Sequence, residues 1–361
     1  MKLLSLTSEN FRNLSPGEIS FHPLANLIVG RNGQGKTNLL EAIYLLGTTR
    51  SFRTTRVGSL FRFDSPNLFV SGILEREGLQ RTLSAGLEGG EGRRRVLMIN
   101  GEKVALSPYL EASSVVAYSA ARLDAIRGTP EERRRFLDRG IASVQRGYVG
   151  QLSRYMRVLR QRNALLSDIA HHRQSAATLD AWDDELIDAA GAIHRARSAY
   201  ADDLAQAHEE IVRSHGYHVS NLKISYQPSL TDELSKRRQQ EIRARMSLAG
   251  PQRDLVEMLI DGRPAAEVLS GGEQKMTVLF LKFAKVELLR RRTGESPLLL
   301  LDDIDAELDL EILQKLLLNL PEQTQLFATS AKDSILARLE TGPHRRLSVE
   351  NGRVTSSQDF T

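Results

Sequence analysis

The sequence predicts an α/β protein that is split by an inserted helical domain, and three regions of the chain support this fold class. The apolar segment 19–30 is typical of two strands, and a helix-period pattern follows over 37–47. From about residue 130, long helix-period patterns replace the strands, and the last third alternates strands with helices again. We therefore expect one α/β body built from both ends of the chain.

The composition limits the classes of protein that the chain can belong to. The chain has 361 residues, of which 41% are hydrophobic, enough for one large core or two domains. No apolar run approaches the roughly 20 residues of a membrane span, and the N-terminus has charges where a signal peptide has an apolar block. The absence of cysteine excludes disulfides and thiolate sites, and the eight histidines show no metal-binding spacing. We expect a cytoplasmic protein without a membrane partner.

The first third has local signals for strands. Residues 3–11 alternate loosely between apolar and polar, and two further apolar segments, 68–74 and 94–101, are also strand-like. Glycine-rich turns such as 87–92 separate them. This region therefore predicts some antiparallel sheet within the α/β body.

The middle of the chain predicts an antiparallel helical hairpin. One apolar face continues through a helix-period pattern from about 130 to 170, the polar segment HHRQSA interrupts it, and a second long pattern extends from 179 to 211. A strand at 219–230 and a basic helix at 235–246 follow. The resulting domain limits are 1–115 for the first part of the body, 116–245 for the inserted helical domain and 246–361 for the second part.

GRNGQGKT (30–37) matches G-x-x-x-x-G-K-[ST] and stands between a predicted strand and a predicted helix. In such a phosphate loop, backbone N–H groups and the positive end of the helix dipole hold the phosphates. Lys36 is expected to bridge the β- and γ-phosphates and to be exposed without ligand, Thr37 is expected to hold Mg²⁺, and Gly47 is expected to end the helix. The predicted nucleotide-binding residues are Gly30, Arg31, Asn32, Gly33, Gln34, Gly35, Lys36 and Thr37.

LLLLDD (298–303) predicts a buried parallel strand that places two carboxyl groups at its C-terminal end. Asp302 is the expected Mg²⁺ partner beside Thr37. Asp303 is the expected residue that polarises the attacking water, so Lys36 and Asp303 are the predicted catalytic residues. Asp303 is one methylene shorter than a glutamate, so it should position the water less well, which favours slow hydrolysis.

VLSGGEQK (268–275) permits two interpretations. Ser270 is a good N-cap for the long helix that follows, which needs no further function. The bare N–H groups of Gly271 and Gly272 at a helix start also suit a phosphate. LSGGEQ about thirty residues before LLLLDD resembles the ATPases of the ABC class. The resemblance implies an ABC-type (SMC-like) P-loop ATPase head, in which the serine loop touches the ATP held by another copy. The implied in-trans residues are Ser270, Gly271, Gly272, Glu273 and Gln274.

The whole chain resembles one family within this class more closely. Ser270 lies 234 positions after Lys36, with a helical insertion between them, as in SMC-related DNA ATPases. The RecF family of bacterial recombination-repair proteins is similar nearly from end to end. The matching segments are ENFRNL (9–14), GRNGQGKTNLLEAIYLLGTTRSFR (30–53), GTPEERRRFLD (128–138), LRQRNALL (159–166), GPQRDL (250–255) and LLLLDDIDAELD (298–309). The chain departs from the family at Ala120-Ala121, where a Pro-acid pair is common, and at Gly271 and Glu273, where Gln residues are common.

The resemblance implies a function in DNA repair and replication, in response to DNA damage. It implies ATP and Mg²⁺ as cofactors, an ATP-dependent homodimer, and weak DNA-stimulated ATPase activity that acts as a switch. The implied partners are DNA, as a duplex or a single-/double-strand junction, and recombination-mediator proteins of the same pathway. The alternative function is that of a soluble ABC-type subunit that energises a separate complex. A third possibility, a small-molecule kinase with a phosphate loop, is disfavoured by the LSGGEQ segment.

One region is strongly basic. Between Arg122 and Asn163 there are eleven arginines and four acids, which favours a polyanion partner or a solvated helical face. Arg133, Arg134 and Arg135 are the predicted DNA contacts. Some of them are expected to pair with Glu131, Glu132 or Asp138, and one or two are expected to pack internally. Their contacts to phosphate carry no base sequence information.

Overall fold

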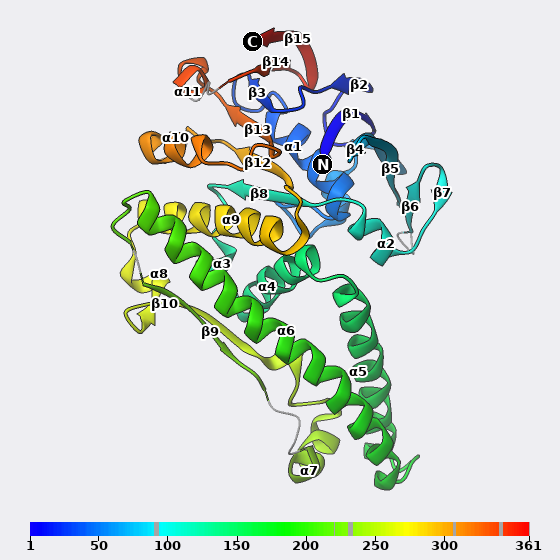
Figure 1. The fold of residues 1–361 in the computed structure, drawn as a ribbon. Helices are drawn as coiled ribbons and strands as arrows, with labels where there is room; N and C mark the ends of the chain where they lie inside the picture. The colour runs from blue at the N-terminus through cyan, green and yellow to red at the C-terminus, as the bar shows by residue number, and fades with distance from the viewer. Residues whose placement is uncertain (90–93, 220, 230–233, 306–307, 339–341, 361) are drawn as a thin grey trace. The chain divides into compact units, whose positions relative to one another are not determined.

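The computed structural model of the chain describes residues 1–89, 94–219, 221–229, 234–305, 308–338 and 342–360. These residues form two compact units (Figure 1). The first unit contains residues 1–123, 211–218 and 270–361, and the second contains 124–210 and 219–269. The second unit therefore differs from the expected insertion, 116–245: residues 116–123 and 211–218 belong to the first unit, and the second unit continues to residue 269. The physical reason is that its strands at 222–227 and 255–260 pair with each other, so both belong to the same unit.

An antiparallel sheet forms one layer of the first unit, in the strand order β2-β1-β4-β5-β6-β7. Its strands are β1 (Lys2–Glu9), β2 (Gly17–Ser20), β4 (Asn67–Arg76), β5 (Leu79–Glu88), β6 (Arg95–Ile99) and β7 (Glu102–Lys103). The strands expected near 3–11, 68–74 and 94–101 are confirmed. Strand β5 was not predicted, because its first four residues are polar or exposed. The Glu77–Gly78 turn before it, with φ of 53° and 77°, is a two-residue hairpin turn.

A mixed sheet forms the second layer of this unit, in the order β15-β14-β3-β13-β12-β8. Its strands are β3 (Ala25–Val29), β8 (Val115–Ser119), β12 (Leu298–Asp302), β13 (Gln325–Ser330), β14 (His344–Glu350) and β15 (Arg353–Phe360). All neighbours except β14 and β15 are parallel. LLLLDD does form a buried parallel strand in the sheet interior, as predicted. Because parallel strands end at one edge, the C-terminal ends of β3, β8, β12 and β13 meet there.

Helix α1 (Lys36–Thr48) lies between these two sheets and contacts strands of both (Figure 1). Leu39, Leu40 and Ile43 are at most 1% exposed in a core shared with both sheets. The prediction that Gly47 ends this helix is wrong. Gly47 lies inside α1, where close packing against β8 leaves no room for a side chain: a Cβ there would stand 2.3 Å from Val115 Cγ2. Thr49, with φ of 58°, terminates the helix instead.

The remaining elements of the first unit are short, except for one helix. They are η1 (Val57–Leu60), α2 (Leu106–Glu111), α9 (Gly271–Thr293), α10 (Leu310–Leu318) and α11 (Asp333–Arg338). Helix α9 contacts β8 and buries most of its apolar side chains, and Gly294 ends it in a left-handed conformation. Among the described residues, no helix has the length and apolarity needed to cross a bilayer.

The second unit contains the predicted helical hairpin and a small antiparallel sheet, β11-β10-β9. Its elements are α3 (Asp124–Arg127), α4 (Pro130–Val144), α5 (Tyr148–Ala170), η2 (Ala176–Thr178), α6 (Leu179–Ser214), β9 (Leu222–Gln227), α7 (Leu234–Ala244), η3 (Pro251–Arg253), β10 (Leu255–Ile260), β11 (Arg263–Pro264) and α8 (Ala265–Val268). The last residues of α6, from Ile211 on, belong to the first unit.

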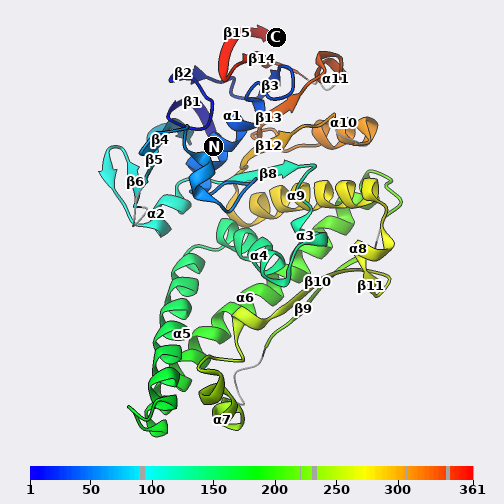
Figure 2. The same cartoon turned by 180° about the vertical axis from the view of Figure 1, so that it is seen from behind.

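Helices α5 and α6 lie side by side and run antiparallel in both views (Figure 2). Tyr155 and Leu159 of α5 share a core with Leu186 and Ile193 of α6, which confirms the hairpin. The expected continuous helix from 130 to 170 is wrong in one respect. It breaks between α4 and α5, where Gly147 has a φ of 78° and precedes the first residue of α5.

Candidate functional site

The glycine loop 30–37 connects β3 to α1, as its sequence predicts, and close packing explains its glycines. A Cβ on Gly30 would stand 2.3 Å from Val349 O, and a Cβ on Gly35 would stand 3.0 Å from Gly352 Cα. Gly35 also has a φ of 110°, which an L side chain rarely adopts. The loop therefore lies directly against the turn of the β14–β15 hairpin, and only glycine fits at these two positions.

Lys36 lies at the start of α1 with its ammonium group folded onto the loop. Its Nζ donates hydrogen bonds to Gly30 O at 2.6 Å and to Arg31 O at 3.2 Å. The residue is only 6% exposed, so the expectation of an exposed lysine is wrong. Burial lowers the pKa of Lys36, and the nearby carboxylates, Asp303 first, act against that shift. Two carbonyl groups of the loop therefore hold the Lys36 ammonium group in place.

Asp302, the last residue of β12, is 4% exposed and faces three hydroxyl groups. It accepts hydrogen bonds from Thr329 Oγ1 at 3.0 Å and from Ser119 Oγ at 3.4 Å, and it also lies near the Thr37 hydroxyl. Burial raises its pKa, and interactions with the Thr37 and Thr329 hydroxyl groups act against that shift. The structure thus brings together the predicted pair, Thr37 and Asp302.

Thr37 and Asp302 offer oxygen donors only, the kind that Mg²⁺ prefers. The described residues contain no group of three or more His, Asp or Glu side chains able to hold a metal by themselves. One or two protein ligands are sufficient for Mg²⁺ when phosphates and water complete the octahedron. The donor set therefore fits a magnesium ion that arrives with a nucleotide.

Asp303 follows directly and adopts a left-handed conformation with a φ of 55°. Its backbone N–H donates to Thr329 Oγ1 at 2.8 Å, so one hydroxyl on β13 contacts both acids. Partial burial raises the pKa of Asp303, and the neighbouring carboxyl group of Asp305 raises it further. The raised pKa suits a group that exchanges a proton with water. The sequence analysis gave Thr329 no contact with these acids, because the pairing of β12 with β13 is not local.

Ser270 is the N-cap of α9, as predicted, and it forms a complete capping box. Its Oγ accepts from Glu273 N at 3.3 Å, and its own N–H donates to a Glu273 carboxylate oxygen at 2.7 Å. His218 Nε2 stands 3.0 Å from the other oxygen of Glu273. Hydrogen bonds from Ser270 and then His218 lower the pKa of Glu273 to about 2. Ser270, Gly271 and Gly272 remain exposed.

A buried carboxylate on α1, which the sequence did not reveal as a site residue, joins other segments of the first unit. Glu41 is fully buried and pairs with Arg12, which donates to it from Nε and Nη2, and it also accepts from the Ser51 hydroxyl. Arg53 Nη1 lies 3.7 Å from the same carboxylate. Arg12 belongs to the ENFRNL segment, so that motif was the available signal. The next residue, Asn13, accepts from Asn38 Nδ2 of α1 at 2.6 Å.

Arg133, Arg134 and Arg135 lie on α4 in the second unit, and all three are half-buried. Arg133 Nη1 donates to Gly128 O at 3.0 Å, and Arg134 Nη1 donates to Asp254 O at 2.8 Å. Arg135 pairs with Glu131, as expected. Burial is the main cause that lowers the pKa of Arg134.

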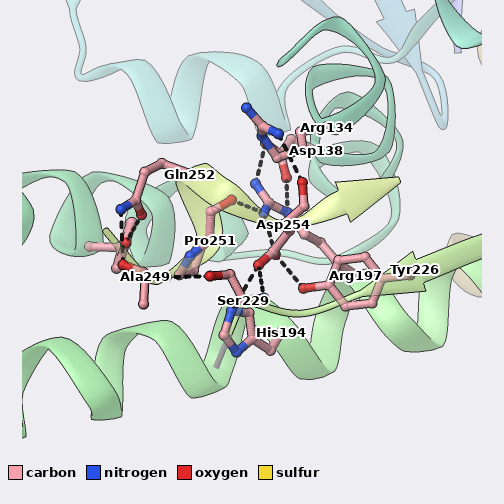
Figure 3. Close-up of polar contacts among 12 residues, drawn as sticks. Arg134, Asp138, His194, Arg197, Tyr226, Ser229, Ala249, Pro251, Gln252 and Asp254 are labelled. Atoms are coloured by element: carbon pink, nitrogen blue, oxygen red, sulfur yellow. Dashed lines mark hydrogen bonds and ion pairs between the residues drawn. The ribbon is translucent and has the colours of Figure 1, made fainter. Parts of the chain in front are cut away.

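The other two acids expected beside these arginines have different partners. Glu132 closes a capping box with Thr129. Asp138 binds Arg197 through two hydrogen bonds of 2.9 Å, beside Arg134 (Figure 3). The arginine run is therefore largely engaged within its own unit.

The first unit contains all three elements of the candidate site: the glycine loop 30–37, strand β12 with its terminal acids, and helix α9 with Ser270 as its N-cap. Together with the mixed sheet, these elements define the class of this protein as an ATPase head of the ABC and SMC type. A family model described as the RecF/RecN/SMC N-terminal domain matches residues 2–351.

The chain belongs to the RecF family. It is 35% identical over 352 residues to the DNA replication and repair protein RecF of Natranaerobius thermophilus, and the match covers 91% of each chain. It is 34% identical over 371 residues to the protein of the same name from Geobacter sulfurreducens, covering 98% of this chain and 100% of the relative.

Solved structures agree with this assignment. A structure of the recombination mediator protein RecF with ATP, in the RecFOR pathway, aligns with a TM-score of 0.88 and 28% identity, over 100% of this chain and 98% of the other. An SMC head bound to the C-terminal winged-helix domain of ScpA aligns with a TM-score of 0.55 and 16% identity, which shows a shared fold only.

Proposed function

We propose that this protein is an ATP-dependent DNA-binding protein of recombinational repair and replication maintenance. Its relatives are named DNA replication and repair proteins, and one similar structure holds ATP. The observation that carries the proposal is the meeting of Lys36, Thr37, Asp302 and Asp303 at one sheet edge. We expect the protein to act in the cytoplasm at gaps or junctions in DNA and to help load recombination factors.

In this proposal the loop 30–37 binds the phosphates of ATP, and Lys36 exchanges its carbonyl partners for phosphate oxygens. Thr37 and Asp302 hold Mg²⁺, which supplies charge neutralisation on the phosphates. Asp303 orients and polarises the attacking water, and its raised pKa makes it a stronger base than an ordinary aspartate. Because aspartate is shorter than glutamate, we expect slow turnover, stimulated by DNA and used as a switch.

We further propose that the serine loop, 270–274, contacts ATP held by a second copy of the chain, so that ATP closes a homodimer. One feature of the structure supports this. Ser270, Gly271 and Gly272 are exposed at the start of a long helix, where N–H groups and the helix dipole favour an anion. The Ser270 side chain interacts with the Glu273 carboxylate in the capping box, so binding a phosphate oxygen would replace that partner.

The test mixes two inactive variants. Lys36→Ala removes the phosphate counter-charge, and Ser270→Arg fills the space for the partner's phosphate, so each variant alone should lack ATPase activity. A heterodimer has one intact site, which combines Lys36 of one chain with Ser270 of the other, and one doubly broken site. Mixing should therefore restore up to half of the normal activity per dimer, measured with duplex DNA at high protein concentration.

Native mass spectrometry of the mixture provides the control. A mixture that remains inactive although heterodimers are detected would exclude the composite site. Activity of wild-type protein that does not respond to DNA would instead favour a subunit that energises another complex.

A further inference from the structure

A second basic surface lies in the second unit, away from the arginine run of α4 in the sequence. Between Leu234 and Arg253 the chain has six cations and a single acid, Glu241. Five of these cations are exposed and form what we call the basic face: Lys236, Arg237, Arg243, Arg245 and Arg253. Among the described residues, the guanidinium groups of Arg237, Arg243 and Arg245 have no hydrogen-bond or ion-pair partner.

Helix α7 is docked through one side, which leaves the basic face outside. Leu234, Arg238 and Glu241 are spaced by four and three residues and therefore share one side of the helix. Leu234 is 2% exposed and Glu241 is fully buried, while Arg238 Nη2 binds Asp180 at 2.5 Å and Asp183 at 2.9 Å. The one acid of the segment is thus removed from the surface, and the cations remain.

A fully buried arginine holds this orientation. Arg162 of α5 donates from Nη2 to Glu241 at 2.7 Å, from Nε to Asp183 at 2.7 Å and from Nη1 to Ser247 Oγ at 2.7 Å. Buried ion pairs add little net stability compared with apolar packing, but breaking one is strongly unfavourable, so they select one geometry. The LRQRNALL segment, which contains Arg162, therefore fixes the direction in which α7 presents its cations.

The GPQRDL turn brings a fifth cation to the same face. Gly250 has a φ of 120°, and a Cβ there would stand 2.4 Å from Tyr155 Oη. Asp254 is fully buried and accepts from Tyr226 Oη at 2.5 Å, Ser229 N at 2.8 Å and Arg197 Nη1 at 2.8 Å (Figure 3). These contacts make the turn rigid.

Arg253 stands between Gln252 and Asp254 in this turn and is exposed. Its Nη2 lies 4.0 Å from Met246 Sδ, just after α7. A rigid turn and a rigidly docked helix therefore contribute cations to one surface.

We propose that the basic face contacts the phosphate backbone of duplex DNA. This inference rests on the proposed DNA-binding function and names the residues that carry it. Exposed arginines that have no ion-pair partner among the described residues suit phosphate oxygens, whereas Arg133, Arg134 and Arg135 have partners inside the protein. No aromatic residue occurs between 234 and 253, so the face lacks the stacking platform that single strands use. We therefore expect binding that is independent of base sequence.

The experiment compares two double variants that remove the same charge. Arg237→Gln with Arg243→Gln removes two cations of the basic face, and Arg81→Gln with Lys103→Gln removes two exposed cations of the first unit. Binding to a random-sequence duplex is measured by fluorescence anisotropy over a series of salt concentrations. Each lost phosphate contact lowers the slope of log K against log salt by about 0.9, so the first variant should lose about 1.8 and the second almost nothing.

A second pair, Arg245→Gln with Arg253→Gln, tests the turn independently and protects against a folding defect in α7. It should also lose about 1.8 in slope if both residues contact phosphate. Equal slopes for the wild type and both basic-face variants would overturn the inference, as would equal losses in the Arg81/Lys103 control.

Two further results separate this inference from the function on which it rests. If the basic-face variants lose affinity for poly-L-glutamate but keep the DNA slope, the face serves an acidic protein, and the inference fails. Failure of the wild type to bind duplex DNA would overturn the proposed function itself.

Discussion

Thr329→Val should separate the two acids of the candidate site from their shared hydroxyl while keeping the shape of the side chain. Thr329 is fully buried, and its Oγ1 donates to Asp302 at 3.0 Å and accepts from Asp303 N at 2.8 Å. Leaving such partners without a hydrogen bond costs about 1–3 kcal/mol each when they are buried. Asp302 keeps its hydrogen bond from Ser119, and Asp303 is exposed, so we expect the lower part of this range, about 2 kcal/mol in total.

The same change should also affect catalysis. Asp303 has a φ of 55°, a conformation that costs about 1 kcal/mol for a residue other than glycine. The hydrogen bond from its N–H to Thr329 offsets this cost, so the variant should lose the defined position of the Asp303 carboxylate. A displacement of about 1 Å reduces catalysis by roughly a hundredfold. We therefore expect kcat to fall about ten- to a hundredfold, while KM for ATP changes little.

The assay is urea unfolding combined with steady-state ATP hydrolysis, and Thr329→Ser is the matched control. Serine keeps the hydroxyl and loses one methyl group, which costs about 1 kcal/mol of stability at most. It should preserve kcat. If the valine and serine variants have the same kcat, the hydroxyl does not position Asp303, and the assigned role is refuted.

Two further predictions concern catalysis and pH. Asp303→Asn should still bind ATP and dimerise but hydrolyse it at least about tenfold more slowly, because the general base is lost while Asp302 remains for Mg²⁺; unchanged single-turnover rates would remove Asp303 from this role. Burial lowers the pKa of His208 to about 4, from an ordinary value near 6.5. The unfolded chain therefore binds more protons between these values, and about 3 kcal/mol of stability that is present above pH 6.5 should be lost by pH 4. Denaturant unfolding from pH 7 to 4.5 should show a weaker pH dependence for His208→Gln, whereas the exposed control His172→Gln should follow the wild type.

Features that depend on neighbours along the chain could be predicted from the sequence alone. The loop 30–37 needs glycines, a lysine and a following helix within a few residues, and LLLLDD combines a buried strand with its terminal acids. Ser270 and Glu273 form their capping box within one helical turn. These features are local, so periodicity and spacing were sufficient to predict them.

Contacts between residues far apart along the chain became known only from the folded structure. Gly47 has a high propensity to end a helix, but its close approach to β8 keeps it inside α1. Arg134 belongs to a run of cations, yet a carbonyl 120 residues away binds it, while the cations near α7 remain outside. The physical reason is that the sequence shows which kinds of group a charged side chain can bind. Whether another group of the protein already binds that side chain depends on burial and on the pairing of distant strands and helices.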